Sequence, residues 1–136
     1  MIPYLHFDGT CEEAFRFYAR ILGGEIVAMM PHEGTPAADH VPPEWKGKII
    51  HARLKAGSQE LMGSDAPPGM FRPMQGFSVS LHPETGVEGK RIFDALSEGG
   101  TVHMPFQPTF WSTQGFGMCV DRFGTPWMVT ADGPTG

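Results

Sequence analysis

Histidine side chains are the groups in this sequence that could most readily do chemistry near neutral pH. His51 lies in the apolar, strand-like segment 48–56, and His6 and His82 occupy matching positions in two other short strand-like segments. An imidazole can act as a general acid or base, or as a metal ligand. His51 is the preferred candidate for a functional role, because a repeat in the sequence is sufficient to explain the other two.

The two cysteines suggest different roles. Cys11 lies in the first turn of a predicted helix, where the amide dipoles lower the pKa of a thiol. Nucleophilic catalysis would also need a nearby base, and the spacing provides none. Cys119 lies inside a strand-like segment, which indicates a core position. Two cysteines are too few for a disulfide framework, so we expect reduced thiols in a cytoplasmic protein.

Aromatic and methionine side chains form a larger candidate set. They are Phe77, Phe110, Trp111, Phe116, Trp127, Met62 and Met128. Such side chains make an adaptable apolar wall, which suits a small, largely apolar or aromatic molecule. A few polar groups would orient that molecule, and the candidates are His51, Arg53, Ser78 and Ser80. The alternative is that these side chains fill the interior of the protein and leave no cavity.

An internal repeat determines which elements position these groups. Residues 12–31 align with residues 88–107, with Phe17 matching Phe93 and Gly23-Gly24 matching Gly99-Gly100. Each copy also follows a short strand-like segment. A duplicated segment of this length indicates two copies of one supersecondary unit.

Each copy is predicted to be a βαβββ unit. Helices are expected at about residues 11–22 and 86–98, because Thr10 and Thr85 begin capping-box matches and the Gly-Gly pairs end the apolar periodicity. Strands are expected at residues 2–8, 25–30, 48–56 and 59–64, and again at 77–82, 101–105, 115–121 and 126–131. The fold class is therefore α+β, with two βαβββ modules forming an open mixed β-barrel or cleft and the helices outside.

The chain is expected to be a single domain over residues 1–136. Module 1 covers about 1–64, a linker covers 65–76, and module 2 covers about 77–132. The Pro-rich loop 31–46 and the segment 106–114 lie outside the regular pattern, and long loops in compact domains are often functional lids. Plain connections or a dimer contact are the alternatives. The histidines of the first loop, His32 and His40, are expected to be solvated.

Composition excludes several classes of partner. The formal net charge is −5, and no basic stripe exists to bind phosphates, so we expect no nucleic-acid partner and no anionic membrane partner. No apolar run approaches the roughly 20 residues that span a bilayer. The N-terminal residues lack a basic region followed by a long apolar segment, so no signal peptide is expected and the predicted location is cytoplasmic.

Several motifs together resemble a known family. They are FDGTCEEAFRFYARILGG, IIHARL, TFW and GFGMCVDRFGTPWMV. With the paired units, they resemble the vicinal oxygen chelate superfamily, which includes glyoxalase I, extradiol dioxygenases, fosfomycin-resistance enzymes and bleomycin-binding proteins. The chain looks most similar to the phosphonate-operon B-like branch, often labelled 3-demethylubiquinone methyltransferase-like. The resemblance covers nearly the whole chain and places the strand of His51 along the barrel wall.

The resemblance also implies where a metal would bind. Metal-dependent members of the superfamily carry His, Glu or Gln on four cleft strands, and the matching positions here are Pro3, Met62, Ser78 and Met128. Proline, two thioethers and a hydroxyl do not provide the nitrogen and oxygen ligands that such a metal needs. We therefore expect no divalent metal and no cofactor. The same match makes the Pro3 side of its strand the cleft side, so His6 is expected to point toward the helix.

Three functions remain open from the sequence. The first is a metal-free domain that binds a small, largely apolar molecule in the cleft. Its predicted pocket residues are His51, Arg53, Met62, Ser78, Trp111, Phe116, Trp127 and Met128, with either Trp127 or Met128 turned inward. The second is an enzyme of lyase, transferase or dioxygenase type with a non-standard site. The glycine-rich loop of a Rossmann-type methyltransferase is not found in this sequence. The third is an interaction protein with a filled barrel. A homodimer is expected, because open barrels leave strand edges and apolar rims.

Overall fold

Two compact units make up the chain, Met1–Arg72 and Pro73–Gly136. The structure, a computed structural model, describes residues 1–132. The division between the units falls inside the predicted linker, residues 65–76. Among the described residues, no helix is long and apolar enough to cross a bilayer.

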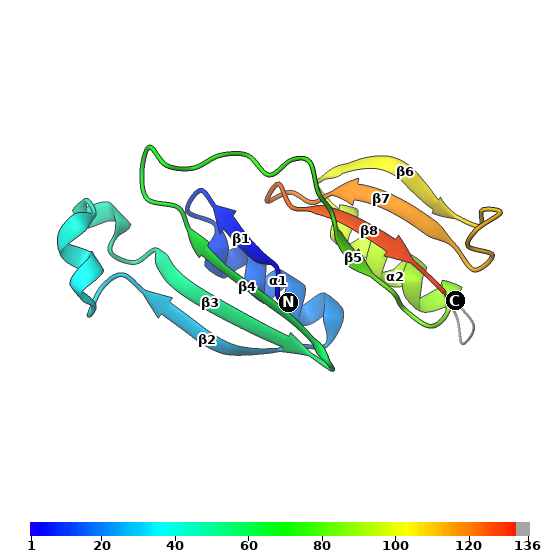
Figure 1. Cartoon of the computed structure of the whole chain (residues 1–136), viewed down its shortest axis with the longest axis horizontal. Coiled ribbons are helices and arrows are strands. Elements are labelled where there is room, and N and C mark those ends of the chain that lie inside the picture. Colours follow the sequence, from blue (N-terminus) through cyan, green and yellow to red (C-terminus); the bar gives the residue numbers. More distant parts are fainter. Residues whose placement is uncertain (133–136) are drawn as a thin grey trace. The chain divides into compact units, whose positions relative to one another are not determined.

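The first unit contains one helix and a four-stranded sheet (Figure 1). Its elements in chain order are β1 (Tyr4–Phe7), α1 (Cys11–Leu22), β2 (Glu25–Pro31), the short 3₁₀ helices η1 (Pro36–His40) and η2 (Pro43–Trp45), β3 (Ile49–Ala56) and β4 (Gln59–Asp65). The strand order is β1-β4-β3-β2. The first strand runs parallel to β4, whereas the other two pairs are antiparallel.

The second unit repeats this plan. Its elements are β5 (Val79–Leu81), α2 (Gly86–Ser97), β6 (Thr101–Gln107), β7 (Phe116–Val120) and β8 (Pro126–Thr130). The strand order is β5-β8-β7-β6, and its first strand again runs parallel to its last. The structure therefore confirms the α+β class and the two βαβββ modules, each with an open, mixed sheet.

Each helix packs on one face of its own sheet. The α1 residues Cys11, Ala14, Phe15, Phe17, Tyr18 and Ile21 are buried. Phe15 lies against Gly63 of β4, where an added Cβ would come within 2.8 Å of the phenyl ring. The second unit has a similar contact on β7, since a Cβ on Gly117 would lie 2.7 Å from the ring of Phe93. A glycine in the strand thus allows the helix aromatic ring to approach the sheet closely.

Four helix ends were predicted, and Gly23 and Thr85 cap their helices as predicted, whereas the C-cap of α2 is the extended residue Glu98, just before Gly99. Gly23 takes the left-handed conformation at φ 65° and ends α1, as predicted. The hydroxyl of Thr85 accepts the backbone N–H of Glu88 at 3.1 Å. The predicted side-chain cap at Thr10 is wrong, because the Thr10 side chain makes no cap hydrogen bond. A buried carboxylate from β4 binds this helix end, since Oδ1 of Asp65 accepts the N–H of Cys11 at 2.9 Å.

The Pro-rich loop is more ordered than its sequence suggests. It forms η1 and η2, and the N–H of His32 pairs with the carbonyl oxygen of Lys48 at 2.9 Å. His32 is 4% exposed, and its ring Nδ1 donates to the same carbonyl at 2.8 Å. The expectation of a solvated His32 was therefore wrong. This histidine fixes the end of the loop beside β3.

Candidate functional site

The helix of each unit covers only one face of its sheet (Figure 1). We call the other side the open face. In the first unit the open face carries Tyr4, His6, Ala28, Met30, His51, Arg53, Met62 and Ser64, as the strand register shows. In the second unit it carries Ser80, Met104, Phe116, Met118, Met128 and Thr130. These two faces hold most of the predicted site residues.

A tyrosine and two histidines meet on the first open face. The hydroxyl of Tyr4 lies 3.3 Å from Nδ1 of His51, and the two rings stack with centroids 5.9 Å apart. The centroid of the His6 ring lies 5.2 Å from that of the Tyr4 ring. Together they present aromatic surface and groups that can donate or accept hydrogen bonds.

The prediction that His6 points toward the helix was wrong. Leu5 and Phe7 are buried beneath α1, so alternation turns Tyr4 and His6 to the open face. The sequence showed which residues share a face, and the resemblance then assigned the wrong face to the cleft. The apolar pair Leu5 and Phe7 was the signal that could have corrected it.

Arg53 and Met62 lie beside each other on the first open face. They are direct partners between β3 and β4. The guanidinium Nε of Arg53 donates to Glu60 at 2.8 Å, and the Arg53 side chain is 36% exposed. The structure thus brings His51, Arg53 and Met62 to one face, as grouped in the predicted pocket. The ion pair holds the Arg53 head in place and leaves part of it accessible.

Methionines form a row across the second open face. Ser80 pairs with Met128, Met128 with Met118, and Met118 with Met104, so one line of side chains crosses all four strands. Met104 is 39% exposed. Thioether side chains are polarisable and adapt to irregular shapes. The row provides an apolar strip that begins with a hydroxyl group.

Aromatic rings lie at one end of this unit. The ring of Trp111 contacts Phe116 edge to face at 5.5 Å and Phe110 at 4.7 Å. Trp111 is 54% exposed, whereas Phe116 is buried. The predicted neighbours Trp111 and Phe116 are thus in contact. Ser78 lies just before β5 and is half-buried.

Trp127 does not share the open face. Its side chain is 1% exposed, and its indole N–H donates to Oδ2 of Asp121 at 2.8 Å. Alternation along β8 turns Trp127 and Val129 to the covered side and Met128 to the open face. The sequence left open whether Trp127 or Met128 faces the cleft, and Met128 is the one on the open face. Trp127 is a core residue, and we do not propose it as a ligand contact.

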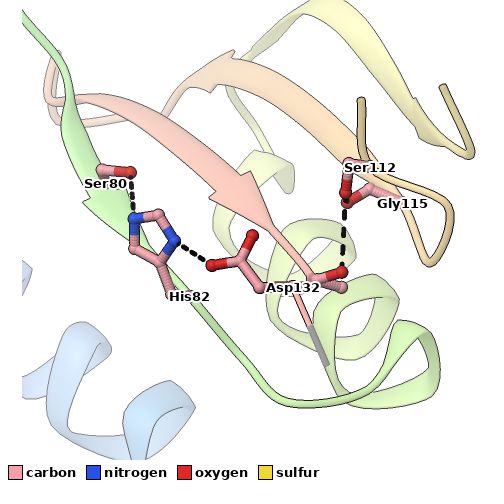
Figure 2. Close-up of polar contacts among 6 residues, drawn as sticks. Ser80, His82, Ser112, Gly115 and Asp132 are labelled. Atoms are coloured by element: carbon pink, nitrogen blue, oxygen red, sulfur yellow. Dashed lines mark hydrogen bonds and ion pairs between the residues drawn. The ribbon is translucent and has the colours of Figure 1, made fainter. Parts of the chain in front are cut away.

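A hydrogen-bonded chain on the second unit was missed by the sequence analysis. Oγ of Ser80 lies 2.9 Å from Nε2 of His82, and Nδ1 of His82 lies 2.6 Å from Oδ2 of Asp132 (Figure 2). Ser80 had been considered only as a polar group that orients a ligand, and His82 only as a match to His6. The Ser-x-His spacing on a strand was the available signal, whereas Asp132 is too distant in sequence to be recognised.

Both cysteine thiols are buried. Burial, and then the charge of Asp65, raises the pKa of Cys11 far above the usual range of a thiol. Burial likewise raises the pKa of Cys119, to about 11. The expectation of a lowered pKa at Cys11 was wrong, because desolvation of the thiolate outweighs the helix dipole. The position of Cys119 in the core agrees with the sequence prediction.

Comparison with known proteins identifies the family. A family model described as 3-demethylubiquinone-9 3-methyltransferase matches residues 1–130. The chain belongs to this family. Protein YjdN of Escherichia coli (strain K12) is 36% identical over 135 residues, which cover 93% of this chain and 91% of that protein.

Solved structures share the fold of the family. Protein PA1353 from Pseudomonas aeruginosa is 47% identical with a TM-score of 0.87, covering 96% of this chain and 95% of its own. A putative 3-demethylubiquinone-9 3-methyltransferase, PhnB protein, from Bacillus cereus is 27% identical with a TM-score of 0.80, covering 96% and 97%. A glyoxylase/bleomycin resistance protein/dioxygenase domain from Frankia sp. EAN1pec is 13% identical with a TM-score of 0.66, covering 96% and 94%, and shows the fold alone. The resemblance inferred from the motifs is thus confirmed.

The residues on the open faces do not suit the metal that the wider glyoxalase fold implies. Tyr4, rather than Pro3, is the open-face residue paired with Met62, and Ser80, rather than Ser78, is paired with Met128. A phenol, a hydroxyl and two thioethers do not form a ligand set for a hard divalent ion. Among residues 1–132, no three His, Cys, Asp or Glu side chains are placed to hold a metal. That the protein binds no divalent metal remains a prediction.

Proposed function

We propose that this protein binds a small, largely apolar or aromatic molecule on the open faces of its sheets. The observation that carries the proposal is the row Met104, Met118 and Met128, which lies opposite the face that α2 covers. The helix of this unit packs on the opposite face and does not cover the row. Apolar ligand sites are lined in this way, by apolar side chains with a few polar groups.

Polar groups next to the apolar surface would orient the molecule. On the first open face these are the Tyr4 hydroxyl, the His51 ring and the Arg53 guanidinium. Arg53 is the cation of this group, so an acidic or electron-rich aromatic ligand suits it. On the second, Ser80 lies at one end of the methionine row and Trp111 adds an exposed aromatic ring.

We do not propose methyl transfer, although the family name denotes it. Nucleotide-binding methyltransferases of the Rossmann type use a doubly wound parallel sheet with a glycine-rich turn after the first strand. In the described part of this chain, each sheet has one parallel pair and two antiparallel pairs. Binding is the function that the side chains support directly.

A screen of small aromatic acids and phenols by thermal shift, followed by calorimetry, tests the proposal. Replacing Met128 by glutamate puts a charge in the middle of the row and should weaken binding about tenfold or more. Val87→Glu is the matched control, because Val87 is an exposed apolar residue of α2 in the same unit. Equal loss of binding in both variants, or no compound bound by the native protein, would contradict the proposal.

We also propose that the protein is a cytoplasmic homodimer. Each sheet has two edge strands, and the apolar side chains Met30, Val102 and Met104 are exposed. Unpaired edges and exposed apolar side chains favour association with a second copy. Multi-angle light scattering should give twice the chain mass of 14.9 kDa at micromolar concentration. A single-chain mass there would contradict the dimer and leave the ligand proposal standing.

A further inference from the structure

Ser80, His82 and Asp132 form a relay of the kind that activates a serine hydroxyl. Oγ of Ser80 lies 2.9 Å from Nε2 of His82, and Oδ2 of Asp132 lies 2.6 Å from its Nδ1 (Figure 2). The two ring nitrogens are therefore engaged on opposite sides, one by a hydroxyl and one by a carboxylate. This is the connectivity of nucleophile, base and orienting acid.

The carboxylate determines which ring nitrogen carries the proton. A carboxylate only accepts hydrogen bonds, so Nδ1 of His82 must be the donor to Asp132. In the neutral imidazole, Nε2 then carries the lone pair and accepts the hydrogen bond of the Ser80 hydroxyl. The contacts thus leave the ring ready to receive the proton of Ser80.

The topology of the second unit assembles these residues. β5 and β8 are neighbours and run parallel, with Ser80 paired to Met128 and Leu81 to Val129. Their carboxyl ends therefore lie together, which brings His82, after the end of β5, next to Asp132, after the end of β8. Ser80 and His82 are two residues apart and share the open face. The sheet itself sets the geometry.

We propose that Ser80 is a nucleophile for acyl transfer from small esters. His82 acts as the general base, and Asp132 is a positioning residue that acts through His82. The substrate class follows from the surroundings of Ser80, since its neighbour across the sheet is Met128, the first of the methionine row. An ester with a short apolar acyl group or an aromatic leaving group suits that surface. The choice of substrate rests on the proposed ligand face, whereas the reactivity of Ser80 rests on the relay.

The reaction balances with an ester and water. Oγ of Ser80 attacks the carbonyl carbon as its proton passes to Nε2 of His82, and the bond from that carbon to the leaving oxygen then breaks. The leaving oxygen takes the proton from His82 and departs as the alcohol, and the acyl group remains bonded to Oγ of Ser80. A water molecule attacks that ester and gives a proton to Nε2, and Oγ recovers it as the carboxylic acid departs.

Another serine of the same unit provides a contrast. The hydroxyl of Ser112 donates to the carbonyl oxygen of Gly115 at 2.8 Å and lies 3.5 Å from that of Ala131. A backbone carbonyl cannot remove the proton, and Ser112 is buried. Ser112 is thus a structural hydroxyl, whereas the hydrogen-bond partner of Ser80 is a base.

A fluorophosphonate and p-nitrophenyl acetate are the probes for the experiment. The full-length protein is incubated with each, the adduct is located by intact mass and peptide mapping, and p-nitrophenol release is followed. We expect one adduct, on Ser80, that is absent in Ser80→Ala and unchanged in Ser97→Ala, a control serine at the end of α2. His82→Gln and Asp132→Asn should slow labelling about tenfold or more. Asp132→Glu should restore part of the rate at an unchanged melting temperature.

The possible outcomes separate this inference from the proposed function. Labelling of Ser80 that is slowed about tenfold or more in His82→Gln and Asp132→Asn supports the relay. No adduct on Ser80, or equal labelling of the native protein and of Asp132→Asn, overturns it. The acetyl group of p-nitrophenyl acetate is small, so its reaction with Ser80 does not require binding to the methionine row. Labelling without binding of aromatic compounds therefore rejects only the ligand proposal, and binding without labelling rejects only the relay.

Discussion

Oδ1 of Asp65 accepts the backbone N–H of Cys11 at 2.9 Å. The other oxygen, Oδ2, accepts the N–H of Ile49 at 2.8 Å. One buried carboxylate at the end of β4 therefore joins the first turn of α1 to the start of β3. This side chain connects three elements of the first unit whose sequence positions are far apart.

Replacing Asp65 by alanine should destabilise the protein strongly. Two buried N–H groups would lose their acceptor, and each unsatisfied group costs about 1–3 kcal/mol, so we expect a loss of about 3 kcal/mol in the free energy of unfolding. Urea denaturation measures it. Thr10→Ala is the control, because the Thr10 side chain makes no cap hydrogen bond. It should cost less than about 0.5 kcal/mol, and the reverse order of effects would show that threonine is the cap.

Trp127→Ala should reduce stability rather than only ligand affinity. The indole is buried and bonded to Asp121, and removal of a buried tryptophan costs about 3–5 kcal/mol. Trp111→Ala should have a small effect on the melting temperature, since Trp111 is half exposed. Calorimetry of both variants checks this, and a stable Trp127→Ala protein with weakened ligand binding would contradict the core assignment.

Tyr4→Phe tests the polar part of the first open face. The change removes the hydroxyl group that lies 3.3 Å from His51 and keeps the stacked ring. Stability should change by less than about 1 kcal/mol, because the contact is exposed. Affinity for an aromatic acid found in the screen should fall severalfold. Unchanged affinity in both Tyr4→Phe and His51→Ala would remove this pair from the proposed site.

The buried thiols should make stability fall at alkaline pH. The pKa of Cys119 is raised from 9.0 to about 11, so the unfolded chain releases this proton first. The contribution is fully present below pH 9 and is lost as the pH rises through about 11. Urea denaturation from pH 8 to 11 checks this. Cys119→Ala should show a weaker decline, whereas parallel curves for the two proteins would contradict it.

Local patterns in the sequence predicted the fold well. The cap at Gly23 was predictable because it depends only on the backbone conformation of that glycine. The cap at Thr85 was predictable because the hydroxyl accepts the N–H of a residue three positions away. Thr10 makes no side-chain cap, and Asp65, which is distant in sequence, accepts the N–H of Cys11 at the same helix end. Propensity and spacing thus identify an element, and they cannot reveal a competing group that the fold brings from elsewhere.

The candidate site was harder to predict for a related reason. Alternation grouped Tyr4 with His6 correctly, but only the position of α1 shows which of the two strand faces is covered. The same ambiguity left Trp127 and Met128 as alternatives. Asp132 was not recognised as a partner of His82, because their contact depends on the parallel pairing of β5 with β8.

That parallel pairing also affects how the chain can fold during synthesis. In each unit the first strand to be synthesised cannot pair until the last has been made, because β1 pairs with β4 and β5 pairs with β8. The first unit has all its strands once Asp65 has emerged, before the second unit has been made. The second lacks a neighbour for β5 until Thr130 has emerged. A nascent chain therefore exposes the unpaired strand β5 until β8 has emerged, and this is when it most needs a chaperone.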